Sequence, residues 1–394
     1  MVPEVLHLCE CYVGGVRTHI DLVLPELRSR GIAVEAWLST RRDADAERCA
    51  EALAAQGVPV RSLALSRGVA WREDRRARRE LASWVAAHPR ALVHSHGAKA
   101  GLLARRVALP GSATRLHMPH GFAFRKAAEF GALRRALIEK VERALAPRTE
   151  LLLAVSEDEA RAARSLGFAP ERVRVLRHGV RTPALAELRS REHARAQLGL
   201  PRQGLLLLVA GILMREKGQE LALRALAEDV AGSWTLALVG AGPREGALRA
   251  LAARLGLGAR VRFVGAVREL APWVDACDLA LLPSHSEGFP YVALEVLARA
   301  RPLLASAVGG LPELWSEAER RAAERAGVPL LLATREVRTW ASALAAWGAA
   351  SAAREELGAL GRARVEASFA LATQVEALVS LYRELASRHA AERR

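Results

Sequence analysis

Residues 284–302 read SHSEGFPYVALEVLARARP, and they indicate the fold more clearly than any other part of the chain. The stretch follows an apolar run, DLALLPS, and places two acids, Glu287 and Glu295, around Gly288 and Pro290. Pro290 suits the first position of a helix, where its missing N–H is not needed. The N–H groups of such a helix start point outward and attract anions. The stretch therefore predicts a buried strand, an anion-binding turn and a helix.

The second acid of this stretch needs a partner. Apolar residues flank Glu295 on both sides, so its carboxylate should be buried. A buried carboxylate is costly unless donors face it, and these could be ligand hydroxyls or protein groups. From the residues alone, both acids could equally be helix caps or members of ion pairs.

Short apolar runs alternate with longer amphipathic stretches along the whole chain, which is typical of βα units and parallel sheets. The apolar runs of the first half are Val5–Leu8, Ala33–Leu38, Val60–Leu65, Ala91–His94, Arg115–Met118, Leu151–Val155 and Val173–Leu176. Those of the second half are Leu205–Ala210, Thr235–Val239, Val261–Val264, Leu279–Leu282, Leu303–Ser306 and Leu330–Leu332. We therefore expect an α/β protein with two doubly wound parallel sheets in succession.

The length of 394 residues exceeds what one hydrophobic core usually fills. The stretch from residue 178 to residue 204 is rich in charges and prolines and has no strand pattern, so we expect the joint there. The predicted domains are residues 1–185 and residues 186–371. Ligands of open parallel sheets bind beyond the carboxyl ends of the strands, so the site is expected in a cleft between the two sheets.

Composition limits the class of protein. The net charge is +15, with +11 in residues 1–185 and +4 in the rest. Nucleic acid, an anionic membrane or a phosphorylated substrate would explain this bias, and so would solubility.

No apolar run approaches the roughly 18 residues that span a bilayer, and MVPEVLHL lacks the layout of a signal peptide. The four cysteines fit neither a disulfide framework nor a zinc site. We expect a soluble cytoplasmic protein.

Three glycine-containing turns follow strand candidates in the second half. VAGILMREKGQE contains Arg215 and Lys217, LVGAGPRE contains Gly240 and Gly242, and ASAVGGLPEL contains a glycine pair. Glycine lets a backbone approach a ligand closely, although one such turn alone is weak support for a phosphate site.

The motifs of the second half, and the order in which they follow one another, resemble those of the family-4 retaining glycosyltransferases. Members of this family carry E-G-F-P with a second glutamate eight positions after the first, matched here by Glu287, Gly288, Phe289, Pro290 and Glu295. The K-G turn, the G-x-G-P turn and the VGG-x-P-E segment also match in sequence order. The resemblance implies the GT-B fold, which consists of two facing Rossmann-like domains.

The first half resembles the same family more loosely. CYVGGVRTHIDLVLPELRSRG is similar to the family's first strand, glycine loop and helix, and implies that Gly14 and Gly15 approach the donor diphosphate. ALVHSHGAKAG and TRLHMPHGFAF are similar to the strand ends that carry His96 and the pair His120 and Gly121 on the acceptor side. The resemblance also implies that a final helix, about residues 372–394, packs back onto the first domain.

The resemblance implies a role for each matched residue. Glu295 would bind ribose hydroxyls of a nucleotide-sugar donor, and Glu287 with the amides of residues 288–290 would hold the sugar and the distal phosphate. Lys217 would neutralise the departing diphosphate, because preorganised positive groups stabilise charge that develops there. Gly240 and Gly242 would line the donor site. His120 would lie near the anomeric carbon and the acceptor hydroxyl.

Two positions depart from the family pattern. The family commonly has an arginine where this chain has Ile212, so one diphosphate-binding cation is missing. Arg215 or Arg17 could supply that charge, and the substitution Arg215→Ala would then slow turnover severely. His178 stands where the family often has an asparagine, so its role is open.

No metal is expected from the sequence. His94 and His96 alternate on one strand candidate, but two histidines without a third ligand make packing or hydrogen-bonding residues more often than a metal site. His117 is expected to be structural. The resemblance also implies that no metal is needed, because enzymes with the GT-B fold generally do without one. Double displacement with Glu287 as nucleophile is chemically open, but the family resemblance implies front-face attack assisted by the leaving phosphate.

Two basic segments also contain aromatic residues, among them Trp71, Trp84, Phe122 and Phe124. A helix with a basic face and apolar anchors can lie on an anionic membrane, and an ordinary solvated helix face has the same composition. The first interpretation would make the protein peripheral at the inner face of the cell membrane.

We therefore predict a retaining, metal-independent glycosyltransferase that uses a UDP-sugar or a GDP-sugar. The expected acceptor is a lipid-linked or cell-envelope glycan of a bacterium, as in polysaccharide biosynthesis. One alternative is a nucleotide-sugar epimerase of the same fold. Another is a basic nucleic-acid-binding protein, but the sequence has no helix-turn-helix, zinc or RNA-binding signature, so no specific nucleic acid is expected.

Overall fold

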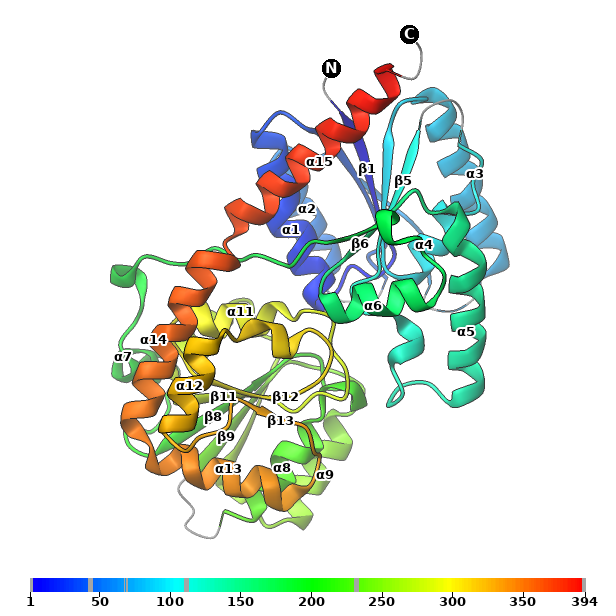
Figure 1. Ribbon diagram of the computed structural model, residues 1–394. Coiled ribbons are helices and arrows are strands. Elements are labelled where there is room, and N and C mark those ends of the chain that lie inside the picture. Colours follow the sequence, from blue (N-terminus) through cyan, green and yellow to red (C-terminus); the bar gives the residue numbers. More distant parts are fainter. Residues whose placement is uncertain are drawn as a thin grey trace. The chain divides into compact units, whose positions relative to one another are not determined.

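The computed structural model describes residues 3–41, 45–66, 68, 70–109, 113–229 and 234–391. The chain forms two compact units (Figure 1). Unit 1 comprises Met1–Arg125, Ala132–His178 and Leu371–Arg394, and unit 2 comprises Lys126–Gly131 and Gly179–Ala370. The boundary between the units thus falls after His178, before the position expected from the sequence. The last three residues of the expected final helix, 392–394, lie outside the described residues.

Unit 1 is built on a seven-stranded parallel sheet with the strand order β3-β2-β1-β4-β5-β6-β7. Its strands are β1 (Glu4–Cys9), β2 (Ala33–Leu38), β3 (Val60–Ser62), β4 (Leu92–His96), β5 (Thr114–Met118), β6 (Leu151–Ala154) and β7 (Val173–Val175). Its α-helices are α1 (Gly14–Ser29), α2 (Ala46–Ala55), α3 (Trp71–Ala87), α4 (Ala98–Ala104), α5 (Ala132–Leu145), α6 (Glu157–Ser165) and α15 (Leu371–Ala391).

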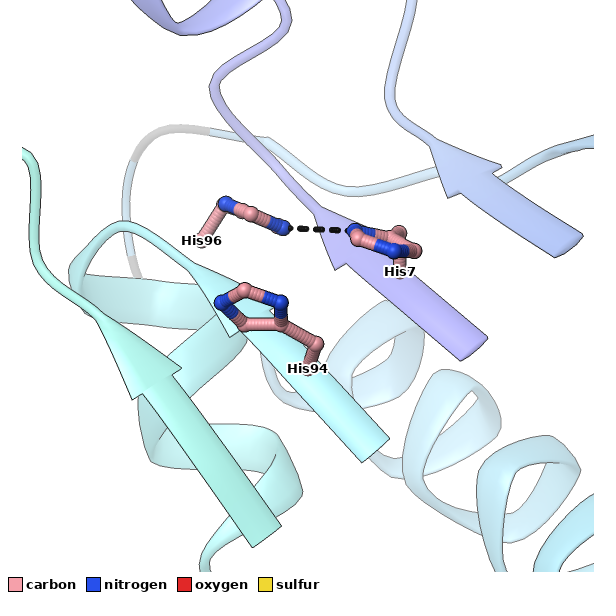
Figure 2. Close-up of side chains that lie close together, drawn as sticks. All are labelled: His7, His94 and His96. Carbon is pink, nitrogen blue, oxygen red and sulfur yellow. Dashed lines mark hydrogen bonds between the residues drawn. The ribbon is translucent and has the colours of Figure 1, made fainter. Parts of the chain in front are cut away.

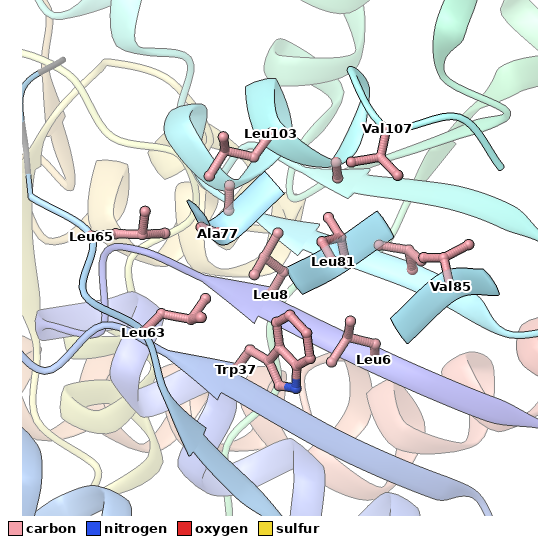
Figure 3. Close-up of a cluster of buried hydrophobic side chains, with 13 residues drawn as sticks. Leu6, Leu8, Trp37, Leu63, Leu65, Ala77, Leu81, Val85, Leu103 and Val107 are labelled. Atoms are coloured by element: carbon pink, nitrogen blue, oxygen red, sulfur yellow. The ribbon is translucent and has the colours of Figure 1, made fainter. Parts of the chain in front are cut away.

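The two faces of the unit 1 sheet differ in character. Leu6 and Leu8 of β1 point to one face and join a cluster with Trp37, Leu81 and Val85 (Figure 3). Side chains alternate along a strand, so the residues between them, starting with His7, point to the opposite face. The last helix, α15, packs against α1 (Figure 1). One face of the sheet therefore carries a large apolar cluster, and the opposite face carries buried polar groups that include His7.

Unit 2 is built on a six-stranded parallel sheet with the strand order β10-β9-β8-β11-β12-β13. Its strands are β8 (Leu205–Ala210), β9 (Trp234–Val239), β10 (Val261–Gly265), β11 (Leu279–Leu282), β12 (Leu303–Ser306) and β13 (Leu331–Leu332). Its α-helices are α7 (Arg191–Gln197), α8 (Gln219–Ala227), α9 (Glu245–Arg254), α10 (Ala271–Ala276), α11 (Tyr291–Ala298), α12 (Glu317–Arg325), α13 (Val337–Ala349) and α14 (Ser351–Ser368).

Both sheets start in the middle and extend outward in two directions, which is the doubly wound arrangement of Rossmann-like folds. The predicted fold class is therefore confirmed. One local detail was wrong: Pro290 is the N-cap of α11 in extended conformation, and the helix starts at Tyr291. Proline has no N–H to donate at either position, so the helix loses no hydrogen bond.

Candidate functional site

The opening stretch of the sequence forms a polar group at the carboxyl end of β11. The Nζ atom of Lys217 lies 2.7 and 2.9 Å from the two carboxylate oxygens of Glu287. Ser284 donates its hydroxyl to Glu287 Oε1 over 2.6 Å. The Glu287 side chain is only 7% exposed, whereas that of Lys217 is 26% exposed. The structure thus brings together two predicted donor-site residues that are 70 positions apart.

Glycines allow the loops around this group to approach one another. A Cβ atom on Gly309 would overlap the backbone carbonyl of Glu287, and one on Gly218 would overlap that of Pro283. Both glycines have positive φ, +56° and +67°. In addition, the Gly310 N–H donates to the Gly288 carbonyl over 2.9 Å. These contacts hold the Glu287 backbone against the VGG segment, so the glycines there support the acid's position.

Glu295 lies on α11 and is half-buried. Burial raises the pKa of its carboxyl group to about 7. Within the described residues, no hydrogen bond to this carboxylate is found. The sequence predicted a buried acid in need of donors; the side chain is instead half-buried, and it lacks such donors among the described residues. A ligand that offers hydroxyl groups would supply them.

Phe289 contributes differently from its neighbours. Its side chain is 2% exposed and packs against Phe369 of the same unit, with 5.2 Å between ring centroids. Phe289 was predicted to contact the sugar donor. Its side chain instead packs in the core, so only its backbone could contact a ligand.

The glycine turns after β8 and β9 also come together. Gly240 has a φ of +131°, and a Cβ atom there would overlap the Gly211 carbonyl, while one on Gly242 would overlap Leu213. Their first role is therefore close packing of two turns. The carbonyl of Ile212 accepts a hydrogen bond from Gln219 Nε2 over 3.0 Å.

The two cations considered as replacements at the Ile212 position lie in different units. The Arg215 side chain is exposed, in the turn before α8 of unit 2. Arg17 is half-buried on α1 of unit 1. The predicted role of either residue stays a prediction.

In unit 1 the glycine loop begins α1. Gly14 has a φ of +55° and Gly15 follows it in the first turn of this 16-residue helix. No acidic residue lies in that first turn, so the positive end of the helix dipole is not neutralised locally. This is compatible with the diphosphate role that the resemblance implies.

His96 and His120, which the resemblance assigns to the acceptor side, lie next to each other in unit 1. His96 is the last residue of β4, and its Nδ1 lies 2.9 Å from His120 Nε2. His120 has a φ of +54°, a left-handed conformation that is unusual for a side chain other than glycine. Gly121 follows with a φ of +92°. The turn after β5 therefore holds His120 in a conformation that is costly for a residue other than glycine, whereas Gly121 adopts its own conformation without strain.

A buried acid that was not predicted from the sequence, Glu159, stabilises this turn. Glu159 accepts hydrogen bonds from the N–H of Gly121 over 2.6 Å and from the N–H of Val155 over 2.8 Å. Burial raises the pKa of Glu159 to about 7, although both hydrogen bonds act to lower it. A signal for this residue existed: Ser156 caps α6 and Glu159 stands three positions later, as in a capping box.

Glu10 is a second acid that the sequence reading missed. It is 6% exposed and accepts from the N–H of Ala100 over 3.1 Å, at the start of α4. A Cβ atom on Gly97 would lie 3.2 Å from its Oε2. Glu10 therefore ties the loop after β1 to the loop after β4, and with them Gly14 to His96.

The other histidines singled out from the sequence, His94, His117 and His178, are also buried in unit 1. His117 is hydrogen-bonded to Ser95 Oγ over 3.1 Å, in line with its expected structural role. The ring of His178 stacks on that of His120, with 5.3 Å between centroids. His94 is joined by His7, a residue that the sequence reading did not single out, at 5.0 Å between centroids.

Comparison with known proteins identifies the chain's relatives. Residues 13–183 match the profile described as Glycosyltransferase Family 4, and residues 204–347 match Glycosyl transferases group 1. A D-inositol 3-phosphate glycosyltransferase of Kineococcus radiotolerans is 30% identical over 414 residues, with 96% of this chain and 92% of that protein covered. The corresponding protein of Catenulispora acidiphila is 34% identical over 239 residues, or 56% of each chain. In the first three matches, the alignment spans only 39% to 56% of the relative.

Solved structures show the same fold at low sequence identity. A sucrose-phosphate synthase from Thermosynechococcus elongatus superposes with a TM-score of 0.79 at 22% identity, covering 98% of this chain and all of that one. The Anabaena protein HepE in complex with UDP and glucose gives a TM-score of 0.78 at 19% identity, covering 97% of this chain and all of that one. The lipopolysaccharide glycosyltransferase WaaG gives 0.72 at 18% identity, covering 96% and 99%. These similarities confirm the expected GT-B fold.

The two family matches cover different halves of the chain, and the Kineococcus relative joins them in one alignment over nearly its full length. The ordered motifs of the second half, from the K-G turn at Lys217 to the VGG segment, indicate the same relationship. The chain belongs to glycosyltransferase family 4.

Proposed function

We propose that the protein is a retaining glycosyltransferase that moves a sugar from a nucleotide diphosphate sugar to an acceptor hydroxyl. The observation that carries this proposal is the group at the end of β11, where Lys217 and Ser284 hold Glu287. Glu295, with a pKa raised by burial, lies on the helix that follows. Membership of the family supports the reaction class.

The groups at this site match the demands of the reaction. When the bond between the anomeric carbon and the diphosphate breaks, its electron pair moves to a phosphate oxygen. Lys217 and the amide dipoles at the start of α11 would stabilise that negative charge. The acceptor oxygen would attack from the same face, and its proton would pass to the departing phosphate oxygen. This sequence of events retains the anomeric configuration and needs no protein nucleophile.

The two acids would serve binding. Glu295 would accept hydrogen bonds from the ribose hydroxyls, and Glu287 from the transferred sugar. His96 and His120 would stand on the acceptor side, with Glu159 and Glu10 as positioning residues for the turns that carry them. The proposed chemistry requires no metal at the diphosphate.

The chemistry of the substrates is part of the proposal. UDP-sugars are the first donors to test, because HepE was crystallised with UDP and glucose, and GDP-sugars are the second. The sequence suggested a lipid-linked or cell-envelope glycan as acceptor. The names of the relatives favour a phosphorylated inositol as a second candidate acceptor.

A transfer assay tests the proposal. The purified protein is incubated with UDP-, GDP- or ADP-sugars and each acceptor class, and the configuration of the product is read by NMR. We expect transfer with retention from at least one donor. Lys217→Met should lower kcat/KM by about 100-fold or more, because charge stabilisation at the transition state is lost. Glu287→Gln should have an effect of similar size, because the sugar loses a charged acceptor and Lys217 loses its ion-pair partner.

The control for this assay is Glu317→Gln, which removes an exposed acid paired with Arg321 in the same unit and should leave kcat/KM unchanged. Wild-type rates in both Glu287→Gln and Lys217→Met would contradict the proposal. Release of an altered sugar nucleotide without an acceptor would identify an epimerase instead. Nucleic-acid binding that disappears at moderate salt would be nonspecific.

We also propose that helix α5 lies on an anionic membrane surface. No helix among the described residues is long and apolar enough to cross a bilayer. Of the aromatic anchors named from the sequence, Trp71 is 82% exposed, whereas Phe122 is 3% exposed and the Trp84 N–H donates to Glu35. The exposed apolar residues of α5 are instead Leu133 and Leu137, with 88% and 62% exposure, on a helix rich in arginine and lysine.

Vesicle flotation tests this membrane proposal. The wild type should float with vesicles that contain anionic lipid at low salt, because cations contribute on the order of 1 kcal/mol each and apolar residues insert. The double variant Leu133→Ser/Leu137→Ser should float at least several-fold less. The control Leu185→Ser changes a leucine of unit 2 with 70% exposure and should bind like the wild type. Equal flotation of all three would contradict the role of α5.

A further inference from the structure

Three imidazole side chains lie on one face of the unit 1 sheet, opposite the apolar cluster. His7 of β1 is the register partner of His94 on β4, and Cys9 is the partner of His96. Residues that pair across strands, and residues two positions apart on one strand, point to the same face. His7, His94 and His96 therefore converge by sheet geometry, and all three are 0% exposed.

The three rings are close enough to share one ion (Figure 2). The Nδ1 atom of His7 lies 3.0 Å from the Nε2 atom of His96. The centroid of the His94 ring lies 4.3 Å from that of His96 and 5.0 Å from that of His7. One nitrogen from each ring lies within 4.8 Å of the others. A tetrahedral ion with bonds of about 2.0 to 2.1 Å needs ligand nitrogens about 3.4 Å apart, and the separation between His7 Nδ1 and His96 Nε2 is already close to this value.

The hydrogen-bond partners leave nitrogen atoms available inside this group. His94 Nδ1 is hydrogen-bonded to the Tyr382 hydroxyl over 2.7 Å, whereas His94 Nε2 is buried without a partner among the described residues. His7 Nε2 is in the same situation. Buried polar atoms without partners are rare and call for an explanation. A bound cation would provide it for His94, whose second nitrogen would keep its bond to Tyr382, as metal-binding histidines usually do.

The chemistry of the three side chains also fits metal binding, because imidazole is a common ligand of transition-metal ions. Three imidazoles without a carboxylate suit the late transition metals and are poor ligands for Mg²⁺ or Ca²⁺.

We infer that His7, His94 and His96 form a buried binding site for one late first-row transition-metal ion, Zn²⁺ or Cu⁺. The site is separate from donor binding, which needs no metal in the function proposed above. It would join β1 to β4, and through Tyr382 it would join both strands to α15.

The site would also influence the acceptor side. If His96 binds the ion through Nε2, its proton resides on Nδ1, which then donates to His120 Nε2 over 2.9 Å. His120 would in turn carry its proton on Nδ1, a buried atom without a partner among the described residues. The ion would thereby determine the tautomer of a predicted acceptor-site residue.

Metal titration of the full chain tests this inference. Protein dialysed against EDTA is titrated with ZnCl₂ by calorimetry and, without oxygen, with Cu⁺ in competition with a chromophoric chelator. We expect about one equivalent of one of these ions to bind with a Kd below about 1 μM. His7→Gln and His94→Gln should each weaken binding about 100-fold or more, and Tyr382→Phe about 10-fold.

The matched control is His117→Gln, which changes another buried histidine of the same sheet and should keep full affinity. Circular dichroism verifies that each variant is folded. Unchanged affinity in folded His94→Gln, or equal loss in folded His117→Gln, would overturn the inference.

X-ray absorption on the metal-loaded wild type tests the site without any substitution. Three nitrogen ligands near 2.0 to 2.1 Å are expected. Sulfur ligation, or no binding of either ion to the wild type, would also overturn the inference.

Discussion

At the scale of single residues, the predicted acceptor side and the donor site each contain a glutamate with a raised pKa, but the two glutamates differ in their hydrogen bonds. Burial raises the pKa of both Glu159 and Glu295 to about 7. Two backbone N–H groups face Glu159, whereas no hydrogen bond to Glu295 is found in the described part of the chain. Glu159 therefore stabilises a turn through its hydrogen bonds. Glu295 has free acceptor capacity that a ligand hydroxyl could use.

The pKa of Glu295 predicts a dependence of stability on pH. In the unfolded chain this carboxyl group ionises at its ordinary pKa of 4.5, and in the folded protein at about 7. Between these values unfolding releases a proton, so ionisation costs stability as the pH rises toward 7, by at most about 3 kcal/mol. In Glu295→Gln this loss is absent. The melting temperature of the variant should therefore rise relative to the wild type between pH 5 and pH 7.5.

The control for this prediction is Glu336→Gln, on an exposed residue, which should show a constant difference from the wild type over the same pH range. A constant difference for Glu295→Gln as well would show that its pKa is not raised.

At the scale of elements, close approach between loops decides the geometry of the donor site. Gly309 follows β12, and a Cβ atom there would meet the carbonyl of Glu287. Gly327 follows α12 with a similar φ of +65°, yet a Cβ atom on it would meet nothing within 4 Å. Both glycines adopt a left-handed conformation that would strain any residue with a Cβ atom, and only Gly309 also has a close neighbour.

This difference predicts unequal effects of the same substitution. Gly327→Ala should lower the free energy of unfolding by about 1 to 2 kcal/mol through strain in the left-handed conformation. Gly309→Ala adds a steric conflict with the Glu287 backbone, so it should cost more and weaken nucleoside diphosphate binding at least about 10-fold. Chemical denaturation and calorimetry measure both quantities. Equal stability losses with unchanged nucleotide affinity would contradict the proposed role of Gly309.

At the scale of the whole molecule, each unit has its own sheet and core, and the end of the chain belongs to unit 1. Lys217, Glu287 and Glu295 all lie in unit 2, and the histidine group lies entirely in unit 1. Ligands for the two sites should therefore stabilise different parts of the chain.

Scanning calorimetry of the full chain measures this separation. UDP at 100 times its Kd should stabilise unit 2 by about 2.7 kcal/mol and raise the temperature of one transition. Zn²⁺ should raise the temperature of the other transition. Lys217→Met should abolish the first effect and leave the second unchanged. A single transition that both ligands shift equally would mean that the units unfold together.

The fold could be predicted from the sequence more completely than the contacts of the site, and the reason is physical. Apolar periodicity is local, so it predicted every strand and the doubly wound sheets, with errors of a few residues at the ends. The capping pattern of Ser156 and Glu159 was visible, but its second bond, to Gly121, lies 38 positions away. No local pattern encodes such a distance.

By itself the sequence determined the alternation of strands and helices, the glycine turns and the ordered motif around Glu287. These features depend on backbone preferences and burial over a few residues. Only the tertiary structure decided that Lys217 meets Glu287, that Phe289 turns into the core and that His7 joins His94 and His96. Each of these outcomes depends on which strands become neighbours and in which register, and the packing of the whole sheet determines both.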